Sequence, residues 1–153
     1  MNVLALLFAV HLLSAVIWVG GMFFSHMVLR PVLSPQEMER KVPMWGEVLK
    51  RFFPVVWFTV ILLPVTGYAM AWGFFNGPLH SGWHVLVMQI IGWGMIGNFL
   101  RVYFRPYRRM KYMLKELLIP EAGLYLERIR IAMSINLFLG LLLVTATAVG
   151  RFG

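Results

Sequence analysis

The sequence predicts an all-α fold, an integral membrane four-helix bundle with both termini on the outer, periplasmic side. Of its 153 residues, 60% are hydrophobic, and the mean hydropathy of +0.77 is far above that of a soluble domain of this length. Four apolar runs are long enough to cross a bilayer, which takes about 20 residues each. Thirteen of the fourteen Lys and Arg residues lie in, or at the edges of, two of the segments between these runs. We therefore expect one transmembrane domain over residues 1–153.

The positive charges set the expected orientation of the bundle. The predicted spans are 3–29, 53–75, 83–104 and 129–149. The amino terminus and the connection 76–82 carry no Lys or Arg, whereas the segments 30–52 and 105–128 are strongly basic. By the positive-inside rule these two segments are cytoplasmic loops of a multi-pass protein in a bacterial inner membrane. The net charge of +8 then reflects topology and lipid contact, not a nucleic acid partner.

The first apolar run is expected to be a structural helix with a polar stripe. It has no positive charge ahead of it and continues into Phe23 and Phe24, which is unlike a signal peptide. At helical spacing, one face carries His11, Ala15, Trp18, Met22 and His26. An ionisable side chain at this depth is costly and normally faces the bundle interior with a partner. The stripe therefore predicts an interior site.

The two basic segments carry helix signals of their own. Segment 30–52 contains three prolines and is expected to hold a short interfacial helix before Phe52. After Arg105-Pro106, an amphipathic stretch is expected to lie on an anionic leaflet. Pro120 is predicted to mark the first turn of a helix that continues as the fourth span. Six glycines are consistent with close helix contacts in lipid: Gly67, Gly73, Gly92, Gly94, Gly97 and Gly140.

The third span supplies a candidate partner for the first stripe. His84, Met88, Ile91, Met95 and Asn98 fall close to one line on its surface. Spans one and three both run inward, so the two stripes are expected to face each other in parallel. Two facing imidazoles in an apolar bundle suit a b-type haem, with His11 and His84 as the iron ligands. Trp18, Met22 and Met88 would line this site, and Trp83 and Arg151 would lie near the propionates. Arg151 is equally well explained as a headgroup anchor, and His80 is an alternative ligand.

Other cofactor arrangements remain open. One is a second haem held by His26 and Met95. The favoured alternative is that His26 is an interfacial residue, hydrogen-bonded to a carbonyl or to a neighbour of Ser25. Eleven methionines could form a thioether path for Cu(I), although methionine is also ordinary core filler. Filler is the favoured interpretation, with Met22, Met88 and Met95 as the exceptions. The chain has no Cys or Asp, and its glutamates lie outside the predicted spans, so thiolate metal sites and a carboxylate proton relay are not expected.

The segment His11–Pro31, HLLSAVIWVGGMFFSHMVLRP, resembles the copper-resistance protein D (CopD-like) family. Further similar segments are RFFPVVW, GWHVLVMQ, FRPYRRM and INLFLGLLLV, which together extend the resemblance over nearly the whole chain. The resemblance implies a membrane protein connected with copper. The chain is more distantly similar to HemJ-like protoporphyrinogen oxidases, which have a haem-associated His in the first span and a Lys early in the third. His11 matches that histidine, whereas His84 lies near the place of the lysine.

The function that the sequence favours is one-electron transfer by a cytochrome b-like protein that binds haem b. Its redox partner would be a quinone or a periplasmic protein, and a homodimer is left open. The first alternative is a copper permease that uses His11, Met22, Met88 and His84. The second is a haem-dependent porphyrinogen oxidase, an oxidoreductase.

Overall fold

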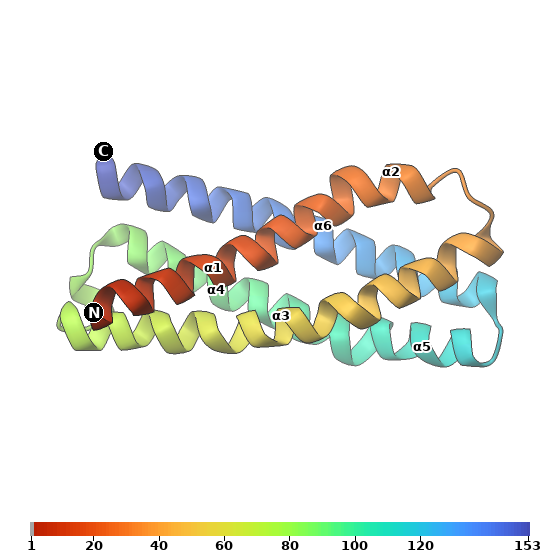
Figure 1. Ribbon diagram of the computed structural model, residues 1–153, viewed down its shortest axis with the longest axis horizontal. Coiled ribbons are helices and arrows are strands. Elements are labelled where there is room, and N and C mark those ends of the chain that lie inside the picture. Colours follow the sequence, from red (N-terminus) through yellow and green to blue (C-terminus); the bar gives the residue numbers. More distant parts are fainter. Residues whose placement is uncertain (1) are drawn as a thin grey trace.

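The computed structural model describes residues 2–153, and over that range it contains helices, short turns and no strand (Figure 1). Four helical rods are long and apolar enough to span a membrane: Val3–Leu33, Met38–Phe74, Trp83–Lys115 and Ile119–Phe152. Both ends of the chain lie at the same end of the bundle. The predicted all-α membrane bundle is confirmed, while the side of the membrane that holds the termini stays a prediction.

The first and third rods are built alike. The first consists of α1 (Val3–Phe24), the π-helical segment η1 (Ser25–Leu29) and α2 (Arg30–Leu33); the third consists of α4 (Trp83–Val102), the π-helical segment η3 (Tyr103–Tyr107) and α5 (Arg108–Lys115). Each π segment lies at an Arg-Pro pair, Arg30-Pro31 or Arg105-Pro106. Because proline has no backbone N–H, the α-helical ladder is interrupted there, and a π turn accommodates the change.

The second and fourth rods are single long helices, α3 (Met38–Phe74) and α6 (Ile119–Phe152). Segments 30–52 and 105–128, predicted as loops, are therefore mostly helical, and only residues 34–37 and 116–118 connect the rods at this end. The separate interfacial helix expected before Phe52 is the first part of α3. The reason is visible in the buried residues Val42, Trp45 and Leu49, whose helical spacing continues into the apolar run. Pro120 does lie in the first turn of α6, as predicted.

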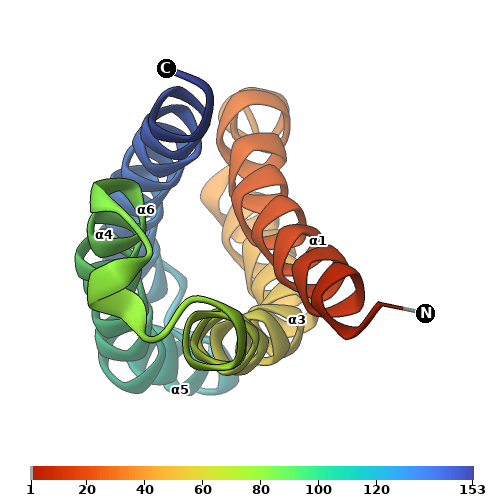
Figure 2. The ribbon, with the colours of Figure 1, turned by 90° about the vertical axis from the view of Figure 1, so that its left-hand side faces the viewer.

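The four rods pair as two hairpins. Helix α1 packs mainly on α3, and α4 packs mainly on α6. Viewed along the bundle, the two pairs diverge at the end that carries the termini (Figure 2). The largest fully buried side chains all belong to the other, basic half: Phe53, Leu49, Met110, Leu126, Ile129, Val42 and Val56. Tight packing is thus concentrated in the basic half.

A cluster of aromatic rings joins the hairpins inside this half. Phe53 of α3 packs edge-on against Phe99 of α4, with ring centroids 5.5 Å apart, and against Tyr107 of η3, at 4.6 Å. Trp57 adds edge-on contacts to Phe99 and Tyr103. Such contacts contribute about 0.5–1.5 kcal/mol each beyond area burial. They fix α3 against the α4–η3 rod.

Candidate functional site

His11 lies between α1 and α3. Its Nδ1 is 2.8 Å from the hydroxyl of Thr66, which is itself 2.6 Å from the Leu62 carbonyl oxygen and donates to it. The ring rests on Gly67, where an added Cβ would be 3.2 Å from the His11 Cε1. The imidazole therefore has its partner in α3, the second rod.

His84 lies between α4 and α6. A Cβ added at Gly150 would be only 2.6 Å from the His84 Cβ, so this glycine allows α6 to approach. The ring leans back over Gly82, whose φ of +98° ends the turn before α4. Among residues 2–153, the buried Nδ1 of His84 has no hydrogen-bond partner. A buried polar atom without a partner is unusual, because such atoms are normally satisfied by protein, water or an ion.

The two histidines belong to different hairpins. At the end of the bundle that holds the termini, Figure 2 shows α1 and α4 on opposite sides. No hydrogen bond or ring contact joins His11 to His84 within the described chain. Spans one and three do meet further in, where Trp18 packs edge-on against Phe99 at 6.4 Å. The prediction that the stripes face each other is thus corrected, because their outer parts face α3 and α6.

His26, predicted as an interfacial residue or a second ligand, has a partner in the fourth rod. Its ring lies in η1, and its Nδ1 is 3.1 Å from the hydroxyl of Ser134 in α6. Met95, proposed beside it, is buried and lies next to Gly140. The sequence suggested a carbonyl or a neighbour of Ser25 as the partner of His26, but the structure supplies Ser134.

The remaining predicted site residues lie toward the end with the termini. Trp83 stacks edge-on with His84 at 6.2 Å and is exposed on its outer side, and Met88 is half-buried in α4. Arg151 and His80 are exposed.

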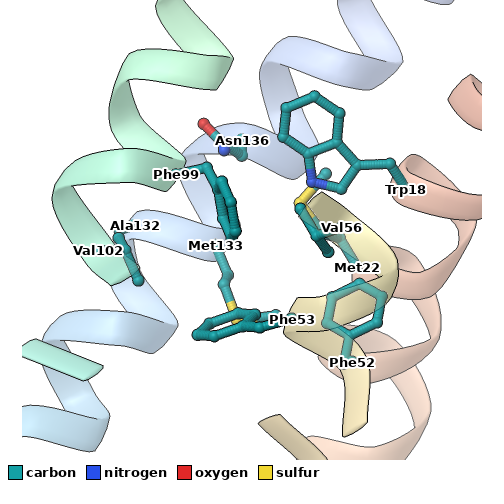
Figure 3. Close-up of a pocket in the computed structure, with 10 residues that line it drawn as sticks. All are labelled: Trp18, Met22, Phe52, Phe53, Val56, Phe99, Val102, Ala132, Met133 and Asn136. Atoms are coloured by element: carbon teal, nitrogen blue, oxygen red, sulfur yellow. The ribbon is translucent and has the colours of Figure 1, made fainter. Parts of the chain in front are cut away.

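A small cavity lies where all four rods meet (Figure 3). Its volume is about 10 Å³, barely enough for one water molecule. The lining is almost entirely apolar: Trp18, Met22, Phe52, Phe53, Val56, Phe99, Val102, Ala132, Met133 and Asn136. Two thioether side chains, from α1 and from α6, thus reach the same cavity.

The single amide at the cavity is held firmly. Asn136 accepts a hydrogen bond from Asn98 at 2.8 Å and donates one to the Met95 carbonyl at 3.1 Å. Asn98 also donates to the Ala132 carbonyl and accepts from Arg101. Because both ends of the Asn136 amide are used, Met22 and Met133 are the lining donors left for a bound ion.

The donor chemistry favours a soft ion. Over the described range no three His, Asp or Glu side chains lie close enough together to hold a metal. Thioethers select Cu(I) among biological metal ions. Sequence reasoning included Met22 but placed it opposite Met88 or Met95. Met133 shares a helical face with Asn136 at i, i+3, and that spacing was the available signal.

These features define a multi-pass helical membrane protein with a thioether-lined cavity at its centre. Comparison with protein families matches residues 46–150 to copper resistance protein D, which is more than half of the chain. The chain belongs to the copper resistance protein D family. No curated protein and no solved structure gives a significant match.

Proposed function

We propose that this protein handles copper in the bacterial inner membrane, taking Cu(I) into the bundle and passing it across. The observation that carries the proposal is the cavity shared by Met22 and Met133 in a chain of the copper resistance protein D family. Two neutral thioethers bind Cu(I) without neutralising it. Such a site holds the ion weakly enough to release it, which transport requires.

The histidines nearer the termini extend this proposal toward the membrane surface. In His11, Nδ1 is taken up by Thr66, so Nε2 is the nitrogen that can face a metal. In His84, Nδ1 is buried and has no hydrogen-bond partner in the described part of the chain. Imidazole and thioether groups both accept copper, so His11 in one hairpin and His84 in the other are the donors through which the ion would reach the central methionines.

The test is Cu(I) binding by purified protein, measured by competition with a chromogenic Cu(I) chelator. We expect the double variant Met22→Leu/Met133→Leu to bind at least tenfold more weakly, because both donors are lost while core volume is nearly kept. The matched control is Met27→Leu/Met44→Leu, since both side chains are exposed and face away from the cavity. Equal binding by the two double variants would contradict the central site.

The haem b prediction is tested on the same preparation. A copper-handling protein purifies without a haem spectrum and protects cells against copper. A sharp α-band in the reduced protein, lost in both His11→Ala and His84→Ala, would replace the copper proposal by haem-based electron transfer. Only a haem-binding protein would need a quinone or periplasmic redox partner, or act on a porphyrinogen substrate.

A further inference from the structure

A groove at the basic end of the bundle carries an unusual concentration of positive charge. It runs between the α4–η3–α5 rod and α6 and has a volume of about 950 Å³. Five guanidinium groups line it: Arg101, Arg105, Arg108, Arg109 and Arg128. Four come from one rod and the fifth from α6, so the charges stand on both walls.

Among residues 2–153 these arginines have no anionic partner. Across the described residues the one ion pair joins Arg130 to Glu127, and no carboxylate lines the groove. Arg101 donates to Asn98, and Arg128 lies over the ring of Tyr125 at 5.4 Å. Five like charges around one groove repel one another, and an anion bound between them would relieve that repulsion.

The rest of the lining indicates what kind of anion fits. Phe104, Ile131 and Val102 line the groove beside the arginines, and Phe104 and Ile131 are largely exposed. A soluble phosphate compound has no apolar group that could pack against this surface. A ligand with both a phosphate and acyl chains matches both halves of the lining, and basic pockets between membrane helices bind such headgroups.

We propose that this groove binds an anionic phospholipid, with its phosphate held between the α4–η3–α5 arginines and Arg128 and its acyl chains along Phe104 and Ile131. Guanidinium groups suit this task because their planar donors bind phosphate oxygens in pairs. The proposal does not depend on copper binding. It makes the α5–α6 end of the bundle a lipid-anchored unit.

The test measures lipid retained by the purified full-length protein in a neutral detergent, by native mass spectrometry after titration with phosphatidylglycerol, cardiolipin or phosphatidylcholine. In detergent there is no charged bilayer surface, so retention reports a site. We expect the wild-type protein to retain one anionic lipid and no phosphatidylcholine. The variant Arg105→Gln/Arg128→Gln, which removes one charge from each wall, should bind the anionic lipid about 30-fold more weakly.

Controls make each outcome decisive. Lys50→Gln/Arg51→Gln removes two charges from α3, outside the groove, and should retain lipid like the wild type. Arg108→Gln/Arg109→Gln is a second groove variant in case the first does not fold. Equal loss in groove and control variants, or no retained lipid in the wild type, would overturn the proposal. Displacement of lipid by equimolar inorganic phosphate, or tighter binding of an oligonucleotide, would also overturn it.

Discussion

The Thr66 hydroxyl sets the state of His11. It donates to the Leu62 carbonyl at 2.6 Å, so its oxygen can only accept from the imidazole. When the hydroxyl hydrogen is directed to Leu62, the proton of neutral His11 lies on Nδ1, 2.8 Å from that oxygen, and Nε2 keeps its lone pair. One buried threonine thus presents the ring nitrogen that a metal would need.

Replacement of this threonine tests the value of the hydrogen bond. Thr66→Val keeps the shape but removes the acceptor, and we expect a loss of about 0.6–1.7 kcal/mol in the free energy of unfolding, the range for hydrogen bonds between membrane helices. Unfolding in mixed detergent micelles would measure it. Thr145→Val is the matched control, because the exposed Thr145 hydroxyl bonds only to Leu141 of its own helix. Equal losses in both variants would mean that the His11 contact contributes nothing.

At the scale of the helix, glycine position decides how closely the rods approach. Of the six glycines expected to make close contacts, Gly67 and Gly140 do so, while nothing lies within 4 Å of a Cβ added at Gly73, Gly92, Gly94 or Gly97. The sequence shows where the small residues are. Only the rotation of each helix shows which of them face a partner.

The crossing of α6 over α1 depends on Gly140. A Cβ there would lie 2.8 Å from Val19 and 3.3 Å from Met95, both packed side chains. We expect Gly140→Ala to lower the free energy of unfolding by about 1–3 kcal/mol through overpacking. Gly94→Ala, which meets nothing, should be neutral or slightly stabilising because alanine favours the helix. The same unfolding titration measures both variants. An unchanged free energy of unfolding in Gly140→Ala would show that the two helices can shift to accept the added methyl group.

At the scale of the whole molecule, charge and connectivity set the architecture. Both termini lie at one end, and thirteen of the fourteen Lys and Arg residues come from segments in or beside the opposite half. Each hairpin repeats the same plan, in which a rod interrupted by a π segment at Arg-Pro is followed by one long helix. In each hairpin a histidine rests on a glycine of the long helix, His11 on Gly67 and His84 on Gly150.

This asymmetry of charge predicts the orientation in the membrane. An alkaline phosphatase fused after Gly153 should be active, and a fluorescent protein fused there should be dark, because the basic end is retained in the cytoplasm. The same reporters inserted after Gln36, in the short turn before α3, should give the opposite pattern. Matching signals from both positions would contradict the four-span topology.

The sequence alone determined the class of fold, the four apolar crossings and the helix start at Pro120, because hydropathy, charge and helix signals are local properties of the chain. The family followed from the resemblance of whole segments, and the match over residues 46–150 confirmed it. It also found Trp18 and Met22, since the 3.6-residue period identifies the buried face of a helix. The tertiary structure alone decided which helix each buried face meets. In the folded chain His11 is hydrogen-bonded to Thr66 and His26 to Ser134, and Met22 lines a cavity together with Met133. Periodicity gives the direction of a face along one helix, whereas its partner depends on how four helices pack together.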